Sequence, residues 1–198
     1  MVVAIARPTI EEQIRDLPSD ALYEIVNGEV VEVAPMGVFA GSIANYLALY
    51  INLYAFSRKL GVAHVEALYR FRDELPQRRP DLSFIAAAQW PGVLTGDTDP
   101  PSLHLVPVMV AEVVSPSNTS AEIEEKRLEY FEAGISLVWV IHPLQRTIHV
   151  YESANQCRVL SICDTLEGGT AIPGFQIKLE DLFAALTPLR TTDLNGTP

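Results

Sequence analysis

The order of hydrophobic and polar positions along the chain predicts a mixed α/β domain that opens with a short helix and a hairpin. Residues 8–17 form an expected helix, because Thr9 and Glu12 together make a capping box at its start. Residues 22–26 and 29–33 have the pattern of strands and are joined by an Asn-Gly dipeptide, which tolerates the positive φ angles of a tight type I′ turn. The sequence therefore predicts an N-terminal β-hairpin.

Two longer helices follow from helical periodicity and from their end signals. Residues 39–59 repeat apolar side chains every three to four positions, and Gly61 is expected to stop this helix. A second capping box begins at Thr119 and predicts a helix that runs to Ala133, with Gly134 as the residue that ends it. The Tyr and Leu side chains of the helix over residues 39–59 are expected to belong to the core.

The other apolar segments are rich in β-branched or aromatic residues and are bounded by turn residues, which is typical of strands. These expected strands cover residues 62–71, 81–87, 106–114, 137–142, 147–152, 158–163 and 175–179. Residues 76–79 read as a polar turn, and residues 182–186 are expected to follow the last strand and help complete the sheet. The nearly continuous hydrophobicity of residues 106–114 indicates a central strand that is covered on both faces.

Length and composition indicate one domain over residues 1–188, with a disordered tail over residues 189–198. A chain of 198 residues, of which 48% are hydrophobic, can bury a sizeable core. No apolar run reaches the roughly 18 to 20 residues that cross a bilayer, and the start lacks the features of a secretory signal. We therefore expect a cytoplasmic protein without a membrane segment. Cys157 and Cys163 are too few for a disulfide framework or a four-ligand zinc site.

The net charge of −11 argues against nucleic-acid binding, because such binding draws its non-specific affinity from Lys and Arg at phosphates. The distribution of the charge weakens this argument. Six of the fourteen basic residues lie in the stretch before Asp81, namely Arg58, Lys59, Arg70, Arg72, Arg78 and Arg79. They are either a phosphate-binding patch or a solvated face that interleaves with acids.

Asp81 and Glu112 are the acids most suggestive of chemistry. Asp81 opens one expected strand and Glu112 lies near the end of the next. If these strands are neighbours, the two carboxylates come together, and Mg²⁺ is commonly held by one or two carboxylates together with water and phosphate oxygens. Such an ion lowers the pKa of bound water and neutralises charge on a phosphodiester under attack.

Glu112 needs a partner, because valines surround it and an unpaired ionised acid is costly in an apolar setting. The candidates are a metal ion, an arginine or Lys126. Lys126 shares a helical face with Ile123 and Tyr130, which points it inward, whereas the acids of this helix are expected to face solvent: Glu122, Glu125, Glu129 and Glu132. An inward lysine could stabilise transition-state charge, but it could equally send its ammonium to water or pair with a helical glutamate.

Several segments together resemble a known family. The stretch VMVAEVVSPSNTSAEIEEKRLEYFEAGISLVWVIHP at residues 108–143, the stretch RPDLSFIAA around Asp81 and the earlier stretch YEIVNGEVVEVAP are similar to the Uma-type family of putative restriction endonucleases. This family is a branch of the PD-(D/E)XK nuclease superfamily. The resemblance extends from about Tyr23 to Leu182 and implies a restriction-endonuclease-like fold, with a mixed sheet flanked by helices.

The resemblance also implies roles for individual residues. Asp81 and Glu112 match the two metal-binding acids, and the backbone carbonyl of Val113 is implied as a further ligand of Mg²⁺ or Mn²⁺. Val114 stands where the superfamily has its lysine, and Lys126 matches the lysine that this branch places on the following helix instead. The implied activity is metal-dependent hydrolysis of DNA phosphodiesters by a homodimer.

Two further positions follow from the same resemblance. Glu24 matches an additional acid that precedes the first core strand. Ala40 stands at the start of the long helix, where many members carry a histidine, and this departure would matter if that histidine positions substrate or metal. Three functions stay open from the sequence: an endonuclease, an inactive nuclease-fold protein that acts as a binding module, and a hydrolase of small phosphoesters.

Overall fold

The computed structural model describes residues 7–72, 76–89, 102–116 and 118–184, and a mixed six-stranded sheet lies at its centre. The strand order is β10-β9-β8-β7-β6-β3, and β7 and β8 are the parallel pair while the other neighbours are antiparallel. The strands are β3 (Gly61–Val65), β6 (Leu82–Ala86), β7 (Met109–Val113), β8 (Leu137–His142), β9 (Thr147–Ser153) and β10 (Gln156–Leu160). All five residues of β7 are buried, so its prediction as a central strand is confirmed.

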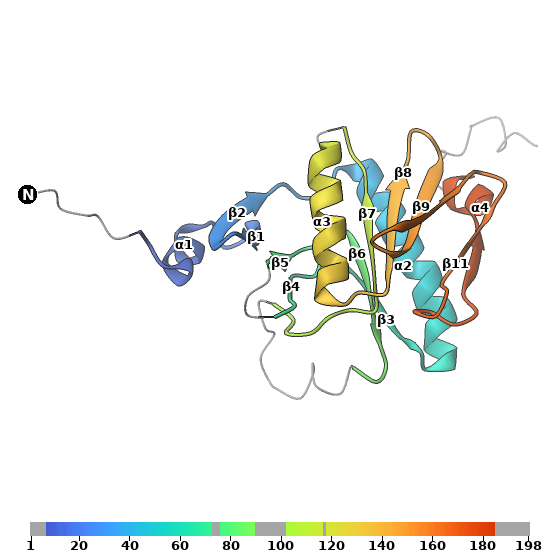
Figure 1. The fold of residues 1–198 in the computed structure, drawn as a ribbon, viewed down its shortest axis with the longest axis horizontal. Helices are drawn as coiled ribbons and strands as arrows, with labels where there is room; N and C mark the ends of the chain where they lie inside the picture. Colours follow the sequence, from blue (N-terminus) through green and yellow to red (C-terminus); the bar gives the residue numbers. More distant parts are fainter. Residues whose placement is uncertain (1–6, 73–75, 90–101, 117, 185–198) are drawn as a thin grey trace, which may run out of the picture.

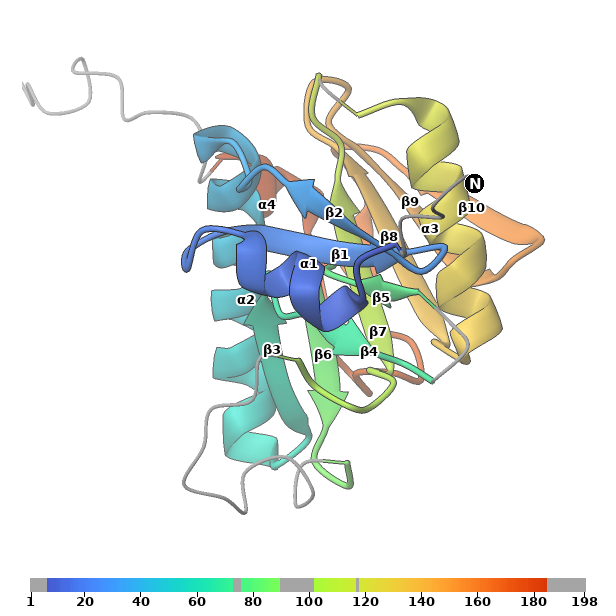
Figure 2. The same ribbon diagram turned by 90° about the vertical axis from the view of Figure 1, so that its left-hand side faces the viewer.

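Helices α2 (Val38–Arg58) and α3 (Ser120–Ala133) cover opposite faces of this sheet (Figure 1, Figure 2). The capping box at Thr119 starts α3, and Gly134 ends it with a φ of 101°, as predicted. The expected fold class is therefore confirmed as a mixed sheet flanked by helices. The connection from β7 through α3 to β8 is the crossover that a parallel strand pair requires.

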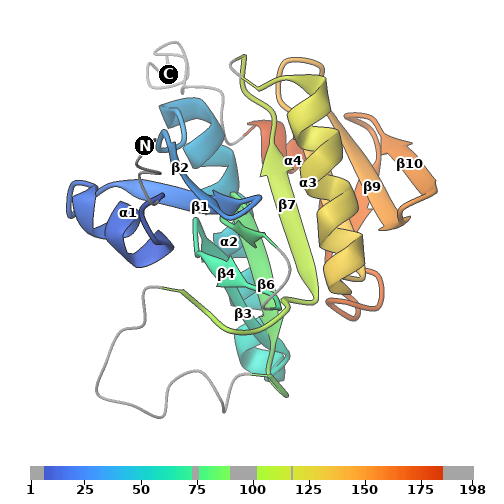
Figure 3. The same cartoon turned by 60° about the vertical axis from the view of Figure 1, so that its left-hand side comes forward.

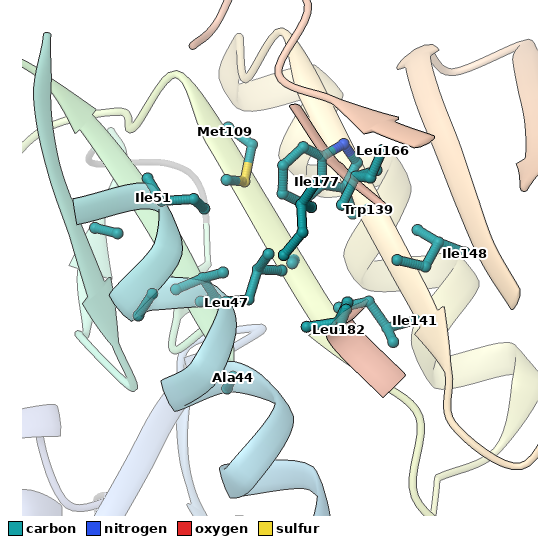
Figure 4. Packing of buried hydrophobic residues seen from close by; sticks show 14 of the residues in the cluster. Ala44, Leu47, Ile51, Met109, Trp139, Ile141, Ile148, Leu166, Ile177 and Leu182 are labelled. Carbon is teal, nitrogen blue, oxygen red and sulfur yellow. The ribbon is translucent and has the colours of Figure 1, made fainter. Parts of the chain in front are cut away.

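The larger hydrophobic core lies between α2 and the sheet (Figure 4). Ala44, Leu47 and Ile51 of α2 have no exposed surface, and neither do Met109 and Trp139 on the facing strands. The C-terminal elements close the same core, namely β11 (Thr165–Glu167), β12 (Gln176–Lys178) and α4 (Leu179–Ala184). A smaller apolar cluster under α3 includes Tyr130 and Val110.

The N-terminal hairpin and two later strands form a separate small sheet, which lies in front of the main sheet, across the space between α2 and α3, in Figure 2 and Figure 3. Its strand order is β2-β1-β5-β4, and its elements are α1 (Ile10–Asp16), β1 (Leu22–Val26), β2 (Glu29–Val33), β4 (Tyr69–Arg70) and β5 (Gln77–Arg78). The predicted hairpin is confirmed, with φ of 53° at Asn27 and 75° at Gly28. The capping box of α1 is also present.

Three local predictions were wrong. The strand expected over residues 62–71 breaks at Glu66, which has a φ of 51°, so its two ends belong to different sheets. Residues 76–79, expected as a turn, contain β5, which pairs with β4 on one side and with β1 of the distant hairpin on the other. Lys59, with a φ of 53°, ends α2 in place of Gly61.

The C-terminal part also differs from the prediction. Strands β11 and β12 pair with each other and do not extend the main sheet, and Leu182 belongs to helix α4. Strand β10 begins at Gln156 and ends at Leu160, earlier than the segment 158–163 that was expected. The tail predicted over residues 189–198 lies outside the described residues.

Gly61 is required because β3 and β6 approach closely there. A Cβ at this position would lie 2.1 Å from the carbonyl oxygen of Ile85, and the φ of 150° is itself unfavourable for other residues. We expect Gly61→Ala to lower the free energy of unfolding by roughly 2 to 4 kcal/mol in urea denaturation. The matched control is Gly41→Ala in α2, where the nearest atom is an ordinary contact at 3.8 Å and the stability should rise slightly. Equal effects of the two variants would contradict this explanation.

Candidate active site

Asp81 and Glu112 face each other across two neighbouring strands. Strands β6 and β7 pair with Leu82 opposite Ala111, and one more step of this antiparallel register brings Asp81 opposite Glu112. Both side chains lie on the face of the sheet that α3 covers, because Val110 of that face is two positions from Glu112. The sequence expectation that these acids come together agrees with their positions in the structure.

The Asp81 carboxylate is fixed by the strand beside it. Its Oδ2 accepts a hydrogen bond of 2.6 Å from the backbone N–H of Val113. Burial and repulsion by Glu112 raise the pKa of Asp81 to about 7, although the Val113 N–H and Lys126 act in the opposite direction. Ionising the Asp81 carboxyl group therefore costs free energy unless a cation lies nearby.

Glu112 is only 4% exposed, and among the described residues Tyr130 and Lys126 contact its carboxylate. The Tyr130 hydroxyl donates a hydrogen bond to its Oε1, and the Lys126 Nζ lies 3.6 Å from its Oε2. Burial raises the pKa of Glu112 above its ordinary value in spite of these partners. Lys126 and Tyr130 thus offset only part of the free-energy cost of burying the ionised Glu112 carboxylate.

Lys126 points inward and joins two of the acids. Its Nζ lies 3.0 Å from Oε1 of Glu24 as well as near Glu112, and its side chain is 20% exposed. Burial alone would lower the pKa of Lys126, but Glu112 and Glu24 raise it to about 12. Of the alternatives that the sequence left open for this lysine, the structure supports inward pairing with the acids, and the ammonium remains charged at neutral pH.

Glu24 comes from β1 and is 3% exposed. Burial acts to raise its pKa, but Lys126, the backbone N–H of Arg79 and the guanidinium of Arg78 together hold it below the ordinary value. The Arg79 N–H donates to Oε1 at 3.0 Å, and Arg78 donates to Oε2 at 2.8 Å. Glu24 is therefore an ionised member of the same cluster.

Arg78 is the part of the cluster that sequence reasoning missed. Its guanidinium donates to both carboxylate oxygens of Glu129, at 2.6 and 2.9 Å, and also to Glu24. The prediction that Glu129 faces solvent was therefore wrong, because its side chain is only 16% exposed. Since Glu129 lies three residues after Lys126, the spacing along α3 was a usable signal that both face inward.

The structure also rules out a single basic patch made of the six residues before Asp81. Arg78 is 5% exposed and faces inward. Arg72 donates to the backbone carbonyl of Ala133, and the guanidinium of Arg58 lies over the ring of Tyr54, 4.1 Å from its centroid. Arg78 therefore does not belong to an exposed phosphate-binding patch, whereas Arg72 and Arg58 make local contacts near the surface.

A cavity of about 340 Å³ opens onto these groups. The hairpin contributes Glu24 and Val31, the start of α2 contributes Gly37 and Ala40, and the sheet and α3 contribute the acids and Lys126. Ala40 thus lies at the site, in the position where the resemblance places a histidine in many members. The rim also carries Glu122 and Glu125 of α3.

The charges of the cluster favour a divalent cation. The acids Asp81, Glu112, Glu24 and Glu129 carry four negative charges when ionised, and Arg78 and Lys126 supply two positive ones, so two negative charges remain. Within the described residues, no group of three or more His, Cys, Asp or Glu is arranged to hold a metal. The available side-chain donors are the two carboxylates Asp81 and Glu112, which suits Mg²⁺ or Mn²⁺ with water completing the shell.

The raised pKa of Asp81 predicts a specific pH dependence of stability. The pKa is about 7 in the folded protein and 3.8 in the unfolded reference, so the folded state binds more protons between these values and loses stability as the pH rises. The variant Asp81→Asn cannot ionise, so it avoids this loss of stability, and its side-chain oxygen can still accept the hydrogen bond from the Val113 N–H. In the presence of a metal chelator at about pH 8, we expect the free energy of unfolding of this variant to exceed that of the wild type by roughly 1 to 3 kcal/mol. This gain should shrink towards pH 5. Urea titrations at several pH values measure this, and a gain independent of pH would contradict it.

Comparisons with known proteins support the fold and identify the family. A solved structure described as a putative nuclease belonging to DUF820, from Anabaena variabilis ATCC 29413, superposes with a TM-score of 0.77 over 91% of this chain and 99% of that chain. The two sequences are 17% identical, so this likeness concerns the fold. A comparison with curated proteins gives no match. The family model Uma2, described as "Putative restriction endonuclease", matches residues 11–180, and the chain therefore belongs to this family.

Proposed function

We propose that this protein is a Mg²⁺-dependent nuclease that hydrolyses phosphodiester bonds of DNA. The observation that carries the proposal is the pair Asp81 and Glu112, two carboxylates that repel each other across neighbouring strands inside a cavity that also holds Lys126. Burying two repelling acids lowers stability, so such a pair indicates a site that binds a cation. Membership of a family described as "Putative restriction endonuclease" supports DNA as the substrate class.

The proposed metal ligands are the carboxylates of Asp81 and Glu112 and the backbone carbonyl of Val113. When bound, Mg²⁺ would supply a water of lowered pKa and positive charge for the phosphate under attack. Asp81 already has its orientation fixed by the Val113 N–H, and Glu112 has its orientation fixed by Tyr130. Both ligands are therefore held in position before a metal arrives, which reduces the cost of ordering them.

Lys126 has a different role in this proposal. Because Glu112 and Glu24 raise its pKa to about 12, it is protonated at neutral pH and does not serve as a general base. A fixed ammonium group beside the acids can orient the attacking water and stabilise the negative charge that develops on the phosphate. Glu24, 3.0 Å away, positions this ammonium group and does not itself need to bind the metal.

Ala40 is the residue that most favours the alternative function, a nuclease-fold protein that binds without cleaving. It lies in the cavity and replaces the histidine that the resemblance leads one to expect. The acidic rim residues Glu122 and Glu125 also do not favour a polyanionic substrate. Against this alternative, Lys126 contacts both Glu112 and Glu24, and Asp81 lies close enough to Glu112 to be repelled by it. A binding module has no evident use for a buried site with surplus negative charge.

Glu112→Gln tests the metal site. This substitution keeps the size of the side chain and removes the charge, so calorimetric titration of Mg²⁺ or Mn²⁺ should show at least tenfold weaker binding. Nicking of supercoiled plasmid DNA should be abolished in the same samples. Glu132→Gln, an exposed acid of the same helix, is the matched control and should leave both properties unchanged. A folded wild type that neither binds metal nor nicks DNA would refute the nuclease proposal and leave the binding module.

Lys126→Met tests the separate role of the ammonium group. We expect metal binding to change by less than the nicking rate, which should fall by about 100-fold or more because transition-state stabilisation is lost. Lys178→Met, at an exposed lysine in β12, is the control and should cut DNA at the wild-type rate. Equal nicking by Lys126→Met and wild type would show that Lys126 is structural.

A further inference from the structure

Helix α2 is apolar on two opposite sides. The side that packs on the sheet buries seven residues: Ala40, Ile43, Ala44, Leu47, Ala48, Ile51 and Ala55. The opposite side exposes seven large apolar residues to solvent: Val38, Phe39, Tyr46, Leu49, Tyr50, Leu53 and Phe56. We refer to this second set as the α2 stripe. A helix that is apolar all round is normally covered on all sides, so the α2 stripe requires a partner.

The spacing of the α2 stripe is that of a helix that packs against another helix. Phe39, Tyr46 and Leu53 are seven residues apart, and Leu49 and Phe56 form a second series with the same spacing, three residues after Tyr46 and Leu53. This alternation of three and four residues keeps side chains on one narrow seam, as at the a and d positions of a coiled coil. The spacing therefore indicates a helical partner and a lengthwise contact.

The charge distribution points to a second copy of the same chain. Charged residues make up 20% of the protein, but residues 38–57 contain none, and Arg58 is the first charge of the helix. Two copies of a chain with a net charge of −11 repel each other over most of their surface. The uncharged α2 stripe is a surface on which they can approach without placing like charges in contact.

The area of the α2 stripe is sufficient for a dimer. Leu53 is 66% exposed and Phe56 is 81% exposed, and from such fractions the seven side chains offer roughly 700 Å² per copy. A stable interface of standard size buries about 800 Å² per partner. The α2 stripe alone therefore offers most of the area of a standard interface.

We propose that the α2 stripe is the interface of a homodimer, in which the α2 helices of two copies pack lengthwise against each other. The contact is isologous, because the same residues of both copies meet. A membrane is a less suitable occupant: α2 passes the length and hydropathy test for a span, but its other side is buried in the core, and the acidic chain would be repelled by anionic lipid. The proposal does not depend on the nuclease function.

The test is the mass of the full chain in solution, measured by sedimentation equilibrium over a range of concentrations. We expect the wild type to have twice the chain mass of 21.8 kDa. The double variant Leu49→Glu with Leu53→Glu places charges in the seam and should raise the dissociation constant of the dimer by more than about 100-fold. The control is Leu128→Glu with Leu144→Glu, at residues that are also exposed but lie outside α2, and it should remain dimeric.

The outcomes separate the proposal from its rivals. Thermal unfolding monitored by circular dichroism verifies that the variants fold, and the milder Leu53→Gln should still weaken the dimer if the double variant does not fold. A wild type that is monomeric at all concentrations, or a folded double variant that dimerises as tightly as wild type, would overturn the proposal. A wild-type monomer that becomes a dimer on removal of residues 185–198 would also overturn it and assign the α2 stripe to the chain's own C-terminal segment.

Discussion

The repulsion between the carboxylates of Asp81 and Glu112 is the constraint on which the arrangement of the site depends. Both groups lie on one face of neighbouring strands, and burial together with their mutual repulsion raises the pKa of Asp81 to about 7. Lys126 and Tyr130 offset part of the cost at Glu112. The remaining cost explains why the site suits a divalent cation: neutralising both acids at once needs a doubly positive charge between them.

The same ionic cluster also holds the N-terminal hairpin in place. Arg78 binds Glu24 of β1 on one side and Glu129 of α3 on the other, so one guanidinium links two elements that are far apart in sequence. Lys126 makes a second link between α3 and Glu24. Removing one partner of such a buried network typically costs about 3 to 5 kcal/mol. The groups proposed to act on substrate are therefore also groups that fix the geometry of the cavity.

The sequence predicted well what local chemistry determines. The capping box at Thr119 and Gly134 gave both ends of α3, and the Asn-Gly dipeptide gave the hairpin. That Asp81 and Glu112 would come together was predicted from the order of the strands, and the register of β6 and β7 places them opposite each other. The side-chain partners of Arg78 were missed, because they lie more than 50 positions away, where no local pattern reveals them. Strand β5 was missed because it is only two residues long and pairs with two other short segments. The break at Glu66 was missed because glutamate is not a residue type that favours a positive φ.

Anomalous diffraction from crystals of this protein soaked in Mn²⁺ would locate a bound metal ion. We expect a Mn²⁺ ion bound by the carboxylates of Asp81 and Glu112, with Lys126 retaining its contact to Glu24. The same peak should be absent from crystals of Glu112→Gln. Crystals of the wild type with no anomalous peak in this cavity at saturating Mn²⁺, or with Mn²⁺ bound only elsewhere, would show that these two carboxylates do not form a metal site.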